Sequence, residues 1–255
     1  MKKILIFLSL LIIISTQGFS QNYKIKTIVI DPGHGGSKPG SVGKISKEKD
    51  VCLQIGLRLG KIFEEKMPDV KIIFTRKTDI DVDLGRRAEI ANNAKADLFI
   101  SIHANSMPVG SKPVRGTETI VAGTGRLNEQ DAALRENADM KLESNYQEKY
   151  KDFTSANPES NIMLSLLKNT YREKSIQLAK FIQENYTNVN KRIDRGVKEQ
   201  NILVLQRCGM PAVLTEVGFI NNPEEELYIN SETGQLEIVT AIFNAVKSYR
   251  TEIEK

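Results

Sequence analysis

The sequence has 255 residues, and its 36 lysines and arginines against 32 acidic residues give a formal net charge of +4 at pH 7. This near balance gives no support for a nucleic acid or a membrane surface as a partner, because such partners favour a clustered basic excess. The two cysteines, Cys52 and Cys208, are too few for a disulfide scaffold. We expect them to be buried free thiols, with a disulfide as the alternative if the chain is exported.

The first 20 residues have the pattern of a secretory signal peptide. Two lysines precede an apolar run over residues 4–14, and Gly18 and Ser20 are small enough for cleavage after residue 20. An uncleaved membrane anchor is the less favoured alternative, since the apolar run is shorter than the roughly 20 residues that span a bilayer. We therefore expect an exported chain with a net charge of about +2 and no membrane span after cleavage.

Six short segments rich in β-branched and apolar residues are the predicted strands. They lie at about 25–31, 70–75, 97–103, 115–122, 201–205 and 211–217. Segments with helical spacing of apolar residues lie at about 48–66, 84–95, 160–188 and 234–250, and a short helix begins at Pro223. Strands that alternate with helices predict an α/β domain with a mixed, largely parallel six-stranded sheet flanked by helices.

Both histidines of the chain stand where a predicted strand ends. His34 lies in Ile-Asp-Pro-Gly-His-Gly-Gly after the first strand, and His103 ends the third. Functional groups of α/β proteins gather at strand ends, and neutral imidazole is the commonest metal ligand. Two unrelated, hydrogen-bonded histidines are the alternative, but no histidine falls elsewhere, so we favour one shared metal site.

A catalytic zinc ion usually has three protein ligands and a water molecule, so two histidines need a third ligand. Glu48, at the start of the first predicted helix, is our choice, with Asp50 and Asp31 as alternatives. Asp31 is also a candidate for a residue that orients a metal ligand.

Glu216 interrupts the apolar strand at 211–217, where a carboxylate is costly to bury unless it is paired or bound to a metal. One interpretation is a general base that takes a proton from a metal-activated water. The other is an ion pair with an arginine such as Arg87. The residues alone favour neither.

Five segments, in this order, resemble the zinc-dependent N-acetylmuramoyl-L-alanine amidases that separate bacterial cells. They are Ile-Asp-Pro-Gly-His-Gly-Gly (30–36), Lys-Glu-Lys-Asp-Val (47–51), Leu84 with Arg87 and Ile-Ala-Asn (90–92), Ser-Ile-His-Ala-Asn (101–105), and Met-Pro-Ala-Val-Leu-Thr-Glu-Val-Gly-Phe-Ile-Asn-Asn (210–222). Thr215, where the family often has an apolar residue, and Asn221, where it often has serine, depart from the pattern.

The resemblance implies a catalytic domain over about 24–252 with one zinc ion per chain, bound by His34, Glu48 and His103. It implies that Glu216 is the catalytic acid and base for hydrolysis of the amide between N-acetylmuramic acid and L-alanine in peptidoglycan. Asn105 or Arg87 would hold the substrate or the frame of the site. The cell-separation type also implies a periplasmic enzyme.

Residues 123–170 exceed what a minimal amidase domain needs, and charged and amide side chains dominate their first part. Similar enzymes carry here a helix that plugs the active site until a partner protein displaces it. Glu136 and Glu143 are seven residues apart, so they share a face of a continuous helix. We expect one of them, with a preference for Glu143, to occupy the open zinc position. A solvated charged helix is the alternative.

Two other functions remain as alternatives. An exported zinc peptidase acting on stem peptides would differ from an amidase in the masses of its products. A non-catalytic peptidoglycan-binding protein would be expected to have an interrupted metal set. The complete set of His34, Glu48, His103 and Glu216 counts against that function.

Overall fold

The computed structural model describes residues 24–108, 110, 114–123, 130–151 and 158–255, and over 158–169 it describes the backbone only. The predicted signal peptide at 1–20 therefore lies outside the described residues, as do parts of the predicted insertion at 123–170. Within the described chain, no helix is both long enough and apolar enough to cross a membrane.

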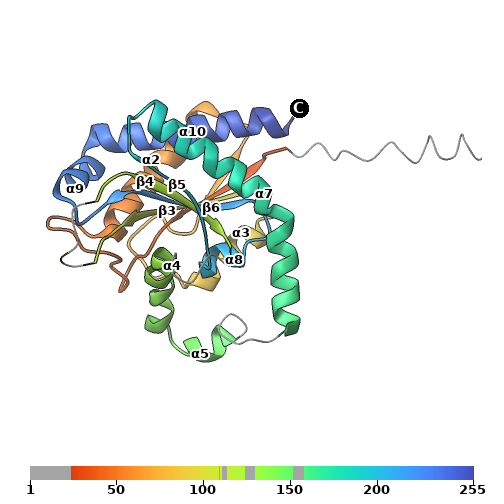
Figure 1. Cartoon of the computed structure of the whole chain (residues 1–255). Coiled ribbons are helices and arrows are strands. Elements are labelled where there is room, and N and C mark those ends of the chain that lie inside the picture. Colours follow the sequence, from red (N-terminus) through yellow and green to blue (C-terminus); the bar gives the residue numbers. More distant parts are fainter. Residues whose placement is uncertain (1–23, 109, 111–113, 124–129, 152–157) are drawn as a thin grey trace, which may run out of the picture.

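A six-stranded mixed sheet forms the centre of the fold (Figure 1). Its strands, in spatial order, are β2 (Lys71–Phe74), β1 (Thr27–Pro32), β3 (Leu98–Asn105), β6 (Ala212–Phe219), β4 (Thr117–Ala122) and β5 (Asp194–Gln200). All neighbours are parallel except β4 and β6, which are antiparallel. The predicted fold class, a mixed and largely parallel six-stranded sheet, is confirmed.

Helices cover both faces of this sheet (Figure 1). One face carries α2 (Glu48–Lys66), α7 (Pro158–Asn188) and α10 (Glu232–Ile253), and the other carries α3 (Leu84–Asn93), α4 (Asp131–Glu136) and α8 (Leu203–Gln206). A further helix, α9 (Pro223–Asn230), follows β6. Because successive strand residues face opposite sides, Ile28 and Ile30 pack in the first core cluster while Val29 packs in the second.

The strand predicted at 201–205 is wrong, because β5 ends at Gln200 and most of that apolar run forms the short helix α8. The apolar residues of α8, Leu203, Val204 and Leu205, are all buried. Their hydrophobicity therefore reflects burial, and a run this short has no period that distinguishes a helix from a strand. β5 itself carries several charged residues, which suits its place at the edge of the sheet.

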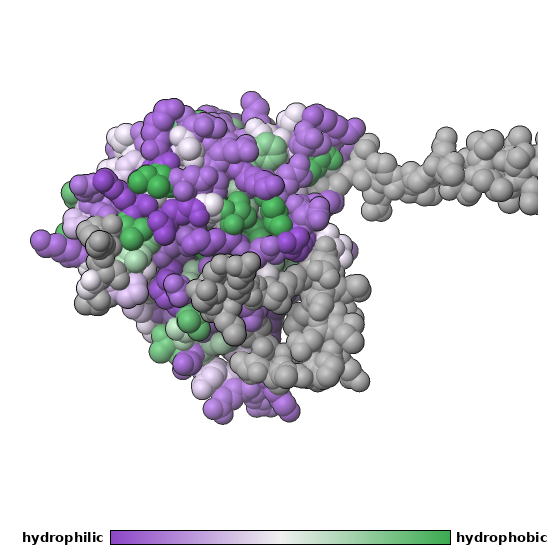
Figure 2. All heavy atoms as spheres, in the orientation of Figure 1, coloured by the Kyte–Doolittle hydropathy of each residue, from purple (hydrophilic) through white to green (hydrophobic). Residues whose placement is uncertain are grey.

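Between residues 130 and 151 the insertion is a chain of short pieces and not one continuous helix, and its last part, from Pro158, begins α7. After α4 come a 3-10 helix, η2 (Asn137–Leu142), and the single turn α5 (Tyr146–Lys149). Asn137 fixes the first break, since its side chain bonds the backbone of Asn201 and Leu203. Figure 2 shows a small hydrophobic patch over the α4–η2 segment, whose exposed large hydrophobic residues are Leu134 and Leu142.

Candidate metal centre and active site

Gly33 allows the two histidines to meet at the end of β1. A Cβ atom at this position would lie 2.4 Å from the ring of His103, so glycine alone leaves room for that imidazole. His34 follows in a left-handed conformation, with φ of 58°. The two ring centroids lie 4.8 Å apart, and both side chains are buried.

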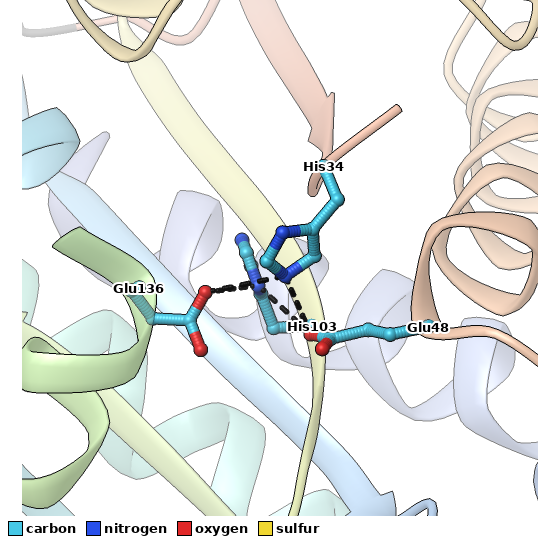
Figure 3. Close-up of side chains that lie close together, drawn as sticks. All are labelled: His34, Glu48, His103 and Glu136. Atoms are coloured by element: carbon cyan, nitrogen blue, oxygen red, sulfur yellow. Dashed lines mark hydrogen bonds and ion pairs between the residues drawn. The ribbon is translucent and has the colours of Figure 1, made fainter. Parts of the chain in front are cut away.

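Glu48, the first residue of α2, reaches both imidazoles (Figure 3). Its Oε1 lies 3.1 Å from His34 Nε2 and 3.0 Å from His103 Nδ1. The backbone N–H of Ser41 donates to Oε2 at 2.7 Å, and that of Ala104 donates to Oε1 at 3.0 Å. These bonds fix the orientation of the carboxylate between the two rings.

Glu136 approaches the same point from the insertion, at the end of α4 (Figure 3). Its Oε2 lies 2.7 Å from His103 Nδ1 and 3.4 Å from His34 Nε2. Next along the segment, Asp139 Oδ2 lies 2.8 Å from His34 Nδ1. The α4–η2 segment therefore contributes two carboxylates to the surroundings of the histidines.

Glu143, the residue preferred from the sequence, lies elsewhere. Its buried carboxylate accepts hydrogen bonds from Lys38 Nζ at 3.2 Å and from the backbone N–H of Leu84 at 2.9 Å. Because η2 replaces the expected α-helix after α4, Glu143 does not share a helical face with Glu136. The order of preference between the two glutamates is therefore reversed.

The four side chains have the donors that a metal ion requires. One donor atom from each of His34, Glu48, His103 and Glu136 lies within 4.8 Å of the other three, and Asp50 is not in this group. The contacts of His34 Nε2 and Glu136 Oε2 with the charged groups around them are ion pairs, and among the described residues neither atom has a partner with hydrogen-bond geometry. Leaving buried polar atoms unpaired is costly, and imidazole nitrogens with carboxylate oxygens suit a divalent transition metal. The residues present therefore fit a metal ion.

The imidazoles and carboxylates of this group shift each other's pKa strongly. Burial acts to lower the pKa of His103, but the charge and close contact of Glu136 and a hydrogen bond with Glu48 raise it to about 10. Burial acts to raise the pKa of Glu136, but the charge of His103 and the close contacts with both histidines lower it to about 2. Positive charge on the imidazoles therefore matches the carboxylates of this group, and a divalent metal ion bound to the neutral ring nitrogens would supply the same charge.

Glu216 projects from the same face of the sheet as His103, its register partner on β3. It is fully buried, and neither of its carboxylate oxygens has a hydrogen-bond partner in the described chain. Arg135 Nη2 lies 3.7 Å from its Oε1. Burial raises the pKa of Glu216 well above its usual range, and the nearby charge of Glu136 adds to this effect. A buried carboxyl that holds a proton beside a metal-binding group has the properties of an acid–base catalyst.

A model of the N-acetylmuramoyl-L-alanine amidase family matches residues 28–248. The chain belongs to this family. Among curated proteins, N-acetylmuramoyl-L-alanine amidase AmiC of Escherichia coli is 32% identical over 228 residues, which are 87% of this chain and 52% of AmiC. The chain thus spans about half the length of this relative.

Solved structures of other amidases share the fold. N-acetylmuramoyl-L-alanine amidase from Clostridium difficile 630 superposes with a TM-score of 0.65 at 29% identity, over 89% of this chain and 97% of that one. The CwlD amidase from Clostridioides difficile, solved in complex with the GerS lipoprotein, gives 0.65 at 26% identity, over 89% and 98%. The resemblance drawn from the sequence motifs is confirmed.

In this amidase-family chain, Arg87 pairs with Asp31 and not with Glu216. Arg87 Nη1 lies 2.7 Å from Asp31 Oδ1, and both side chains are buried. The same guanidinium donates to the backbone carbonyl oxygens of Pro32 at 2.8 Å and His34 at 2.6 Å. Asp31 has no direct contact with either imidazole, so the ion pair positions the backbone of His34.

Asn105 links the reaction centre to the insertion and to β4. Its Oδ1 accepts from Arg135 Nη2 at 2.6 Å, and its Nδ2 donates to Glu118 at 2.9 Å. Arg135 and Asp139 were not predicted from the sequence. The available signal was their spacing, because both lie within three residues of Glu136 and so approach the same site.

Proposed function

We propose that this chain hydrolyses the amide bond between N-acetylmuramic acid and L-alanine of peptidoglycan, using one zinc ion held by His34, Glu48 and His103. The observation that carries the proposal is a buried Glu216, without a hydrogen-bond partner among the described residues, on the same sheet face as His103 of this convergent ligand set. Membership of the amidase family supports the choice of substrate.

The residues of the chain have separate tasks in this reaction. When bound, zinc would polarise the scissile carbonyl and acidify a water molecule. Departure of Glu136 from the site removes a charge that raises the pKa of Glu216. Glu216 in its ionised form then accepts the proton of the attacking water and returns it to the departing alanine nitrogen. Arg87 holds the carbonyl oxygen of His34, which keeps that ligand in place. Asn105 presents its amide oxygen beside Glu216, where it can accept an N–H of the substrate.

We propose further that the α4–η2 segment inhibits the enzyme. Glu136 contacts both histidines of the proposed zinc site, while Arg135 binds the amide oxygen of Asn105 and lies 3.7 Å from Glu216. While this segment is docked, substrate has no free access to these groups. A partner protein that displaces the segment would activate the enzyme, and the GerS complex of the CwlD amidase is a precedent for a protein partner in this fold.

The first residues of the sequence support a site of action outside the cytoplasm. The signal-like pattern over 1–20 supports export, and we propose a periplasmic enzyme that splits the septal wall. The alternatives of a stem-peptide peptidase and a non-catalytic wall-binding protein have no observation of their own in their favour.

Digestion of purified sacculi tests the activity. The zinc-loaded chain, in its wild-type form and as Glu136→Ala, would be incubated with sacculi and the soluble products analysed by mass spectrometry. Intact stem peptides that begin with L-alanine, with the glycan uncleaved, are the expected products. Fragments cut within the stem would show that the enzyme is a peptidase and not an amidase. Binding without any release would leave only a wall-binding role.

A further inference from the structure

A cavity of about 820 Å³ lies beside the reaction centre. Asn105 and Arg135, which contact each other next to Glu216, form part of its wall, so the cavity borders the site. Its volume lies within the range of ligand-binding pockets. The far wall is made by Glu118 of β4 and by Arg195 and Lys198 of β5.

A register shift directs both cations of β5 into this cavity. Residues three apart on a regular strand face opposite sides of the sheet. Here Thr117 pairs with Asp194 and Thr119 pairs with Val197, so β5 has one extra residue opposite Glu118. The extra residue allows Arg195 and Lys198 to face the same side, which is a common use of β-bulges near active sites.

Gly196 provides the backbone conformation for this shift. Its φ is +86°, which side-chain-bearing residues rarely adopt, and its N–H donates to the Asp194 carboxylate at 2.7 Å. The bend is therefore built into the sequence between the two cations.

Glu118 does not neutralise both cations. Its buried Oε2 accepts from Lys198 Nζ at 2.6 Å and lies 3.6 Å from Arg195 Nε, while its Oε1 is bound by Asn105. Arg195 also stacks on Phe219, with its guanidinium carbon 5.1 Å from the ring centroid. The described residues lining the cavity include three basic and two acidic side chains. The charges of Asp131 and Arg135, both on the insertion, offset each other. One positive charge remains on the wall made by the sheet, with or without the insertion.

We propose that this cavity binds the stem peptide of the substrate and that Arg195 and Lys198 bind one of its carboxylates. The proposal rests on the proposed amidase function, and it assigns the peptide side of the scissile bond to the β4–β5 end of the site. N-acetylated sugars have no group that requires a cation, whereas a γ-linked D-glutamate in the stem has a free α-carboxylate. Both cations are about one-third exposed, so their donors are accessible to a ligand.

A pair of peptides that differ in one group tests this assignment. The probes are L-alanyl-γ-D-glutamyl-L-lysine with the glutamate α-carboxylate free, and the same peptide with that group amidated. The cavity is present with the insertion docked, so binding can be measured by calorimetry on the full chain without an activator. We expect the free acid to bind about tenfold more tightly than the amide, as one charge-assisted contact predicts.

Lys198→Gln and Arg195→Gln should each bring this ratio close to one, whereas Lys61→Gln, on the exposed side of α2, should leave it unchanged. If the two cations only neutralised Glu118, their replacement would change thermal stability and leave the ratio as it was. An equal affinity of the wild type for acid and amide, or an unchanged ratio in both variants, would overturn the assignment.

Release of stem peptides from sacculi, measured in parallel, separates this proposal from the one on which it rests. Binding that depends on the carboxylate, without release by Glu136→Ala, would retain the peptide site and reject the amidase activity. Release without any dependence on the carboxylate would retain the activity and reject the peptide site.

Discussion

The Oε2 of Glu136 lies 2.7 Å from the Nδ1 of His103, so a carboxylate of the insertion is in direct contact with the metal-binding group. The residues on either side of it make further contacts with the site, Arg135 with Asn105 and Asp139 with His34. The segment is therefore held by charges that the reaction centre itself provides.

Replacing Glu136 should release part of this inhibition. Glu136→Ala removes a buried charged contact, and a loss of about 1.4 kcal/mol or more from the docked state raises the open population at least about tenfold. Arg135 and Asp139 remain, so release is incomplete. The rate of stem-peptide release from sacculi by the full chain measures the effect.

Glu148→Ala is the matched control, because Glu148 lies on α5 in the same insertion but is exposed. It should leave the rate unchanged. Glu143→Ala should give a smaller increase than Glu136→Ala, since Glu143 anchors the segment to Lys38 and Leu84 and not to the metal-binding group. Equal rates for the wild type and Glu136→Ala would reject inhibition through this carboxylate.

Metal content should distinguish the permanent ligands from the inhibitory one. His34→Ala, Glu48→Ala and His103→Ala each leave two of the three proposed ligands, and we expect each variant to lose zinc on dialysis. Glu136→Ala retains all three and should keep about one zinc per chain. Elemental analysis after dialysis gives the stoichiometry, and the loss of thermal stability on adding a chelator checks that the metal binds the folded state. A Glu48→Ala variant that retained its zinc would exclude Glu48 as a ligand.

Much of this centre could be predicted from the sequence, because its parts stand at recognisable positions. Both histidines follow apolar strands, and Glu48 begins a strongly periodic helix whose predicted range, 48–66, matches α2. Parallel strands place these ends together, so local patterns were enough to predict the approximate position of the site. The Arg87 partner was not predicted, because Glu216 was the one acid considered for it, and the pair with Asp31 depends on how α3 packs against the end of β1.

The insertion was predicted less well for a physical reason. It lacks an amphipathic pattern, so its breaks depend on tertiary contacts such as that of Asn137 with the backbone before α8. Because the helix is interrupted, the seven-residue spacing no longer places Glu136 and Glu143 on one helical face. The prediction of a strand at 201–205 was wrong for a similar reason, because a run that is buried on all sides has no period that distinguishes a strand from a helix.

Glu216→Gln should separate catalysis from metal binding and folding. The substitution keeps the shape of the side chain but removes its acid–base function, so kcat should fall by about 10²- to 10⁴-fold. Zinc content should remain, because Glu216 is outside the ligand set. The thermal midpoint should stay equal or rise, since a buried carboxyl without a hydrogen-bond partner among the described residues is lost. Glu89→Gln, on the exposed surface of α3, is the control. A Glu216→Gln enzyme with wild-type kcat would mean that another residue is the acid–base catalyst.

Asp31→Asn should destabilise the fold by about 3 kcal/mol at neutral pH, because it leaves the buried guanidinium of Arg87 without its carboxylate. Burial raises the pKa of Asp31, but the charge of Arg87 and hydrogen bonds from Thr75, Ser101 and Arg87 outweigh burial, and the net pKa lies below 3.8. Urea unfolding of the wild type and the variant gives the difference in free energy.

The pH dependence of that difference has a definite sign. Since the folded state holds the Asp31 proton less tightly than the unfolded state does, ionisation stabilises the fold above the unfolded pKa. The gap between the wild type and Asp31→Asn should be constant above about pH 5 and should shrink as the pH falls through the folded pKa. Asp69→Asn, which breaks an exposed pair with Arg250, should give a much smaller gap because solvent screens that pair. A gap that widened on acidification would mean that Asp31 is protonated in the fold, and the Asp31–Arg87 pair could then not be what holds His34 in place.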